Sequence, residues 1–172
     1  MTGSQRQQEV MRWLRAEAGF AQLVTVNQAG WPVARTVGAL INEDWSVDLV
    51  QRRVQFRLDQ MRQNPHLEIV WVGTPAPGSR NDHPTVFDYG RRVPRVVFLR
   101  GLAEFMGEEW TVMRYHQQSA TLRAQGFTKA PDRSAENVRE ELVGVRVRPV
   151  RVRAEGFGEG AQSFAWTIEE LT

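Results

Sequence analysis

The 172-residue sequence contains no cysteine and a single lysine, Lys129. The absence of cysteine excludes disulfides, thiolate metal sites, iron–sulfur clusters and cysteine nucleophiles, and it fits a reducing compartment. With one lysine, Schiff-base catalysis is a poor explanation of the function. Of the 22 basic side chains the other 21 are arginines, a bias that a high-GC genome would explain. Even so, arginine binds phosphate well, through a planar fork of donors.

Long apolar runs are also missing, because no run approaches the roughly 20 residues that a membrane-spanning helix needs. Residues 1–15 are polar and charged, without the apolar segment of a secretory signal. We therefore expect a cytoplasmic protein without a membrane-embedded part. The hydrophobic fraction of 41% and the charged fraction of 24% are ordinary for a globular protein. The length fits one domain.

Metal and nucleic-acid sites have little support in the sequence. His66, His83 and His116 lie far apart and lack the spacing of metal ligands, so no metal site is predicted. The arginines that alternate through residues 142–153 are of a kind that meets nucleic acid. However, aromatic residues do not interleave with them and glutamates flank them. A solvated sheet face is the better interpretation, and no nucleic-acid partner is expected.

Periodicity and turn residues predict ten elements. Helices are expected over 4–18, 53–63, 108–124 and 134–141, and strands over 21–26, 32–41, 45–50, 67–72, 93–106 and 142–153. The arginines of the last strand change parity across Pro149, which predicts a β-bulge or a bend there. Residues 73–92 are rich in proline and glycine, and so long a loop is either a functional lid or a mobile insertion.

This order of elements predicts an α+β fold. Six antiparallel strands would leave open edges unless they curl into a closed or nearly closed barrel. We expect one domain over 1–172, with a core of about 20–154, an N-terminal helix over 4–18 and a C-terminal tail over 155–172.

Four short motifs occur in a particular order. The hairpin GWPVARTV begins at Gly30, and Arg57 precedes an Asn-Pro pair by seven positions. The sequence GLAE follows from Gly101, and WTIEEL begins at Trp166. Together they resemble the motifs of the pyridoxamine phosphate oxidase-like FMN-binding split barrels. The likeness covers most of residues 20–154.

The resemblance implies a six-stranded antiparallel split β-barrel with flanking helices that works as a homodimer. FMN would lie in a cleft at the subunit interface, contacted by both chains. The residues at the family's cofactor-binding positions are Arg35, Thr36, Val37, Val50, Gln51, Gln55 and Arg57. Among these, Arg35 and Arg57 would hold the phosphate, since charge-assisted bonds to a phosphate are strong.

The resemblance also implies a flavoprotein that acts as an oxidoreductase on a small organic substrate. A deazaflavin coenzyme in place of FMN, and non-catalytic binding of flavin or haem, are the alternatives. Val96 stands where the true oxidase has a glutamine, and residues 154–172 lack its arginine–histidine cluster, so oxidation of pyridoxamine phosphate is not expected. No catalytic acid or base is predicted, because the flavin would supply the redox chemistry.

Overall fold

The structure is a computed structural model that describes residues 3–18, 20–73, 94–127, 129, 132–158 and 163–168. Its helices are α1 (Gly3–Ala16), α2 (Phe56–Gln63), α3 (Glu108–Ala124) and α4 (Ala135–Glu141). Its strands are β1 (Ala21–Val26), β2 (Pro32–Val37), β3 (Leu40–Ile41), β4 (Val47–Arg52), β5 (His66–Val72), β6 (Val96–Phe105), β7 (Leu142–Glu155) and β8 (Phe164–Thr167). Most of the 73–92 loop lies outside the described residues.

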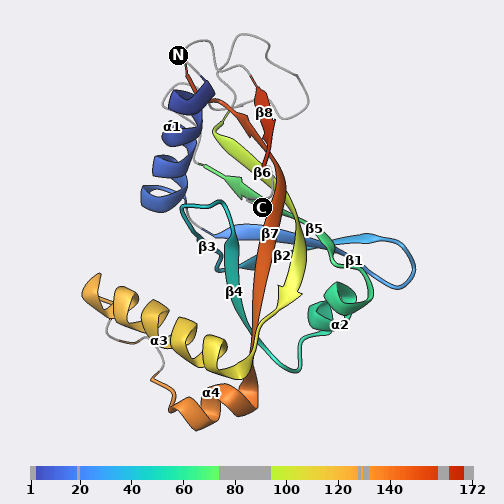
Figure 1. Ribbon diagram of the computed structural model, residues 1–172, viewed down its shortest axis with the longest axis vertical. Helices are drawn as coiled ribbons and strands as arrows, with labels where there is room; N and C mark the ends of the chain where they lie inside the picture. Colours follow the sequence, from blue (N-terminus) through green and yellow to red (C-terminus); the bar gives the residue numbers. More distant parts are fainter. Residues whose placement is uncertain are drawn as a thin grey trace, which may run out of the picture.

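The strands form one antiparallel sheet in the order β2-β1-β5-β6-β7-β4-β3, and β8 pairs with β7 beside this path. The end strands β2 and β3 follow each other in the chain with only residues 38–39 between them, so the sheet curls back on itself as a half-open barrel. Figure 1 shows α1 at one end of the twisted sheet and α3 with α4 at the other. The predicted α+β split-barrel architecture is confirmed.

The predicted strand count was too low, since eight strands are described where six were expected. The expected strand over 32–41 is divided at 38–39 into β2 and β3, and the tail contributes β8. The third strand of the prediction, expected from residue 45, begins two residues later as β4, because Trp45 lies in the preceding turn with φ of 67°. The second helix begins at Phe56, since residues 53–54 form a turn.

The core lies between the inner face of the curled sheet and α1. Alternate residues of β1 and β5 point into it, and the aromatic ring of Trp71 is 2% exposed. From α1, Val10, Trp13 and Leu14 enter the same core, at the i, i+3, i+4 spacing of one helix face. Burying side chains of this size contributes about 1.5–3 kcal/mol each. The N-terminal helix is therefore an integral part of the domain.

A β-bulge interrupts the pairing of β6 with β7, as the change in arginine parity predicted. Arg100 lies opposite Arg151 and Gly101 opposite Pro149, which leaves Val150 without a partner on β6. A Cβ atom on Gly101 would lie 2.4 Å from the carbonyl oxygen of Arg148, so glycine is required at this close approach. Because of the extra residue, the arginines before and after the bulge all face the outer side of the sheet.

On that outer side, a buried carboxylate joins β4 to β7 and α3. The side chain of Asp48 is 0% exposed, and Arg146 donates to it from Nε at 2.8 Å and Nη2 at 3.1 Å. Arg114 Nε lies 2.8 Å from Asp48 as an ion pair without hydrogen-bond alignment. Asn42 Nδ2 donates to the same carboxylate at 3.0 Å. The hydrogen bond to Asp48 raises the pKa of Arg146 despite its partial burial.

None of the helices in the described part of the chain combines the length and the apolar character needed to cross a membrane.

Candidate functional site

Arg35 is held by two uncharged side chains from neighbouring elements. It lies on β2 on the same face as buried Val37, and its Nη1 donates to Gln60 Oε1 at 3.1 Å and to Thr25 Oγ1 at 3.3 Å. The Thr25 hydroxyl, 1% exposed on β1, also donates to Gln60 Oε1 at 2.7 Å. Gln60 belongs to α2, which packs against β1 (Figure 1). The guanidinium is thus oriented without being neutralised.

Arg57 occupies the second position of α2, close enough to Arg35 for the two charges to repel each other. Its Nε donates to Gln55 Oε1 at 2.9 Å. Burial and, second, the positive charge of Arg35 lower the pKa of the Arg57 guanidinium. An arginine nevertheless stays protonated in a protein. Two positive charges, both on partly buried side chains, therefore lie near enough to repel each other.

Neither guanidinium has a carboxylate partner among the described residues, although most other arginines of the chain do. Like charges held together in a partly desolvated place cost free energy, and an anion between them reverses the sign of that interaction. Such an arrangement can bind an anion. Its two charges match a phosphate monoester, which carries about −1.5 to −2 at pH 7.

The beginning of α2 adds to this positive region. Gln55 is the N-cap residue, but its side chain makes no capping hydrogen bond, since its oxygen accepts from Arg57 instead. The N–H groups of the first helical turn have no partner within the helix and carry partial positive charge. Gln55 therefore orients Arg57 and leaves the helix end open to an anion.

The structure brings together three of the seven predicted site residues, namely Arg35, Gln55 and Arg57. The side chain of Thr36 is on the opposite face of β2, where it accepts from Gln22 Nε2 at 2.9 Å. Val37 is 5% exposed and belongs to the core.

The two predicted site residues on β4 are Val50 and Gln51. In the described part of the chain, the hydrogen bonds of Arg35 and Arg57 go to Thr25, Gln60 and Gln55 and not to these two residues. Gln51 is 6% exposed, and its Oε1 atom is buried without a hydrogen-bond partner among the described residues. An unpaired buried amide oxygen is costly, so Gln51 Oε1 can accept from a donor that the described residues do not supply.

Sequence reasoning missed Thr25 and Gln60, the residues that orient Arg35. Each carries a signal in retrospect. Thr25 is a polar residue on the alternating buried face of β1, in line with Ala21 and Leu23. Gln60 follows Arg57 by one helical turn, which places the two side chains on the same side of α2.

No group of three or more potential metal ligands occurs among the described residues. His66 shares a hydrogen bond with Asn64, and His116 lies against the ring of Tyr115. His83 lies outside the described residues.

An antiparallel sheet that curls into a half-open barrel, with helices at both ends, is the architecture of a split β-barrel. The chain matches no protein-family model and no curated protein sequence. Its relationships are therefore seen in solved structures.

A candidate pyridoxamine 5'-phosphate oxidase of Listeria innocua is similar with a TM-score of 0.57 and 14% identity, over 89% of this chain and 99% of the other. An F420 reductase has a TM-score of 0.56 and 16% identity, over 82% and 94%. A heme binding protein of Mycobacterium smegmatis has a TM-score of 0.59 and 21% identity over 91% of this chain, which spans 55% of that protein's length. The fold is thus the pyridoxamine phosphate oxidase-like split barrel.

Proposed function

We propose that this protein is an FMN-binding flavoprotein that acts as an oxidoreductase on a small organic substrate. The observation that carries the proposal is the pair formed by Arg35 and Arg57, two partly buried guanidinium groups without an acidic partner among the described residues. The FMN phosphate would lie between them, at the open N-terminus of α2. Proteins that share the fold include a candidate pyridoxamine phosphate oxidase and a reductase named for its coenzyme.

The residues present fit a phosphorylated flavin. The arginine pair supplies the charge and the fork geometry that a phosphate requires. The partnerless amide oxygen of Gln51 fits a cofactor donor, such as a ring N–H or a ribityl hydroxyl. When bound, FMN supplies the electron-transfer chemistry. The chain's own residues bind the phosphate, orient it through Gln60 and Gln55, and keep the guanidinium charges in place.

A homodimer with the cofactor at the subunit interface belongs to the proposal. Val54 and Phe56 bracket Gln55, and they are 85% and 82% exposed. Large apolar side chains this open beside a binding site are typical of an interaction surface. A second copy of the chain would cover them and complete the site. Sedimentation at micromolar concentration should give about twice 19.7 kDa, and a 19.7 kDa species alone would refute the shared site.

The direct test of the proposed function is a titration of the apoprotein with FMN and with riboflavin, followed by flavin fluorescence. We expect FMN to bind at least about ten-fold more tightly, because charge-assisted bonds to the phosphate contribute about 1.5–3 kcal/mol each. Equal affinities for FMN and riboflavin would show that the site does not bind the phosphate. A failure of both flavins to bind at micromolar concentration would refute the FMN assignment itself.

Replacing Gln60 with glutamate should weaken FMN binding about ten-fold without unfolding the protein. The new carboxylate would stand 3.1 Å from Arg35 Nη1, where it pairs with the guanidinium and competes with the phosphate. Gln63→Glu, which adds the same charge to the exposed last residue of α2, is the control and should change affinity less than about two-fold. Equal losses in the two variants would show a general charge effect and contradict the role of Gln60.

We do not expect the protein to oxidise pyridoxamine phosphate. Residue 96 is a valine, 8% exposed, where the true oxidase has a glutamine, and no arginine or histidine occurs between residues 154 and 172. Turnover of about 1 per second or more would overturn this expectation. A deazaflavin coenzyme or haem would replace FMN in the alternative functions, and each differs in mass from FMN.

A further inference from the structure

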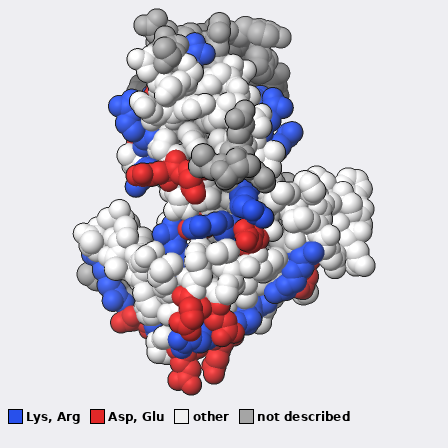
Figure 2. Space-filling model, in the orientation of Figure 1, with Lys and Arg blue, Asp and Glu red and all other residues white. Residues whose placement is uncertain are grey.

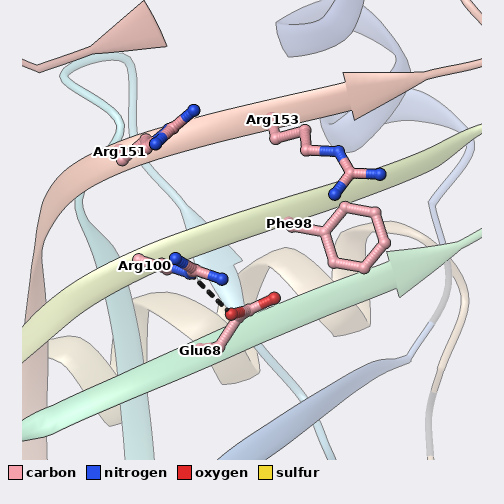
Figure 3. A pocket seen from close by; sticks show the side chains of 5 residues that line it. All are labelled: Glu68, Phe98, Arg100, Arg151 and Arg153. Carbon is pink, nitrogen blue, oxygen red and sulfur yellow. Dashed lines mark hydrogen bonds and ion pairs between the residues drawn. The ribbon is translucent and has the colours of Figure 1, made fainter. Parts of the chain in front are cut away.

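The outer face of the sheet carries a pocket that is separate from the arginine pair. It encloses about 320 Å³ and is lined by Glu68, Phe98, Arg100, Arg151 and Arg153. Figure 3 shows these side chains rising from three adjacent strands, β5, β6 and β7. The volume is at the lower end of the range for small-molecule sites. Arg35 points to the inner face of the sheet, so the two sites lie on opposite faces.

The outer face owes its positive charge to the bulge at Val150, which turns successive arginines to one side. The arginines of this face are Arg100, Arg146, Arg148, Arg151 and Arg153. Figure 2 shows basic side chains across the waist of the molecule, over β7. Four of the five pair with a carboxylate. The pairs are Arg100 with Glu68, Arg146 with Asp48, Arg148 with Glu104 and Arg153 with Glu155.

Arg151 is the exception among these five, because no acidic partner for it occurs in the described part of the chain. It lies directly opposite Arg100 in the register of β6 and β7. Like charges in a directly opposed pair destabilise a sheet. Glu68 already offsets the charge of Arg100, so an anion bound to Arg151 would compensate the positive charge that remains, and arginine's planar fork suits a carboxylate.

The next pair of opposed residues in the pocket, Phe98 and Arg153, presents a planar and partly apolar surface. Phe98 lies opposite Arg153, whose guanidinium carbon is 5.1 Å from the centre of the aromatic ring. The ion pair with Glu155 holds the guanidinium group of Arg153 over the ring. Such a surface suits a planar ligand that stacks on the phenyl ring or on the guanidinium.

We propose that this pocket binds a small aromatic carboxylate, with the carboxylate on Arg151 and the ring against Phe98. The residue that would bind the charge, Arg151, and the residue that would contact the ring, Phe98, belong to successive opposed pairs on this face of β6 and β7. This site goes beyond the proposed flavin site, shares no residue with it and does not depend on it.

The test is a calorimetric titration of the full chain with phthalate at low ionic strength. Arg151→Gln should weaken phthalate binding about ten-fold, since it removes the charge that no carboxylate offsets. Arg148→Gln is the matched control on the same strand, outside the pocket and paired with Glu104, and should change affinity less than about two-fold. Phe98→Leu should weaken phthalate but leave cyclohexane-1,2-dicarboxylate unchanged, because the latter has the charges without the planar ring.

Three results would overturn the proposal. They are no saturable binding of phthalate up to about 10 mM, equal losses in Arg151→Gln and Arg148→Gln, and a change of sedimentation in Arg151→Gln. The last would assign the pocket to a contact between copies of the chain. Because Arg57→Ala should leave phthalate affinity unchanged, failure of this proposal and failure of the flavin proposal give different patterns.

Discussion

Replacing Asp48 with alanine is expected to lower the free energy of unfolding by about 3–5 kcal/mol. The carboxylate is fully buried and pairs with Arg146 and Arg114, which are 33% and 20% exposed in their side chains. Removing it leaves two partly buried positive charges facing each other without compensation. The partial exposure of both arginines places the expected loss toward the lower end of that range.

Urea denaturation followed by tryptophan fluorescence at pH 7 measures this loss. Asp59→Ala is the control, because Asp59 pairs with Arg62 on the surface of α2, where both side chains are at least half exposed. That variant should lose less than about 1 kcal/mol. Asp48→Asn, which keeps the shape and one acceptor oxygen, should lie between the two. Equal losses at positions 48 and 59 would show that the buried network does not stabilise the fold.

Local sequence patterns were sufficient to predict most of the fold. The apolar run with β-branched residues in β1, the Asn-Pro end of α2 and the serine cap of α4 are each determined by residues close in sequence. Ser134 Oγ accepts from the Asn137 N–H and so caps α4. The bulge in β7 could be predicted for the same reason, because the arginines change from even to odd positions within one strand and only an extra residue keeps them on one face.

Contacts between distant residues were not visible in this way. Asp48 and Arg146 are 98 positions apart, and nothing local to either indicates the other. β8 is four residues long and pairs only through the edge of β7, so its own sequence contains little signal. Short strands depend on their partners, and partners are set by the tertiary fold.

The candidate site was predicted in part for a similar reason. Arg35 and Arg57 were chosen from motif positions, and the structure places their charges close together. The uncharged residues that orient Arg35 were missed, because Thr25 and Gln60 belong to no motif. Val50 and Gln51 were chosen by the same resemblance, and their role remains a prediction that a bound cofactor would test.

Replacing Arg57 with alanine should weaken FMN binding about ten-fold to a hundred-fold, which corresponds to roughly 1.5–3 kcal/mol. The substitution removes a charged donor but keeps a residue that favours helix, so the fold should survive. Riboflavin lacks the phosphate and should bind the wild type and the variant almost equally. The result is read from parallel fluorescence titrations of both proteins with both flavins.

Arg57→Lys is the matched variant for geometry. Lysine keeps the positive charge but loses the planar fork and the Nε donor that bonds Gln55, so it should recover only part of the lost affinity. Arg62→Ala, on the exposed side of the same helix, controls for the loss of a charge. Unchanged FMN affinity in Arg57→Ala, or an equal loss for riboflavin, would make Arg57 a surface residue without a role in the site.

The most direct test of the central claim is to identify the small molecule that the natively purified protein carries. The protein is denatured, and the released compounds are analysed by mass spectrometry against FMN, riboflavin, deazaflavin and haem standards. Near-stoichiometric FMN is the result expected from the arginine pair, which matches a phosphate monoester in charge. Release of riboflavin or haem, or of no compound from a protein that also fails to take up FMN, would contradict the account.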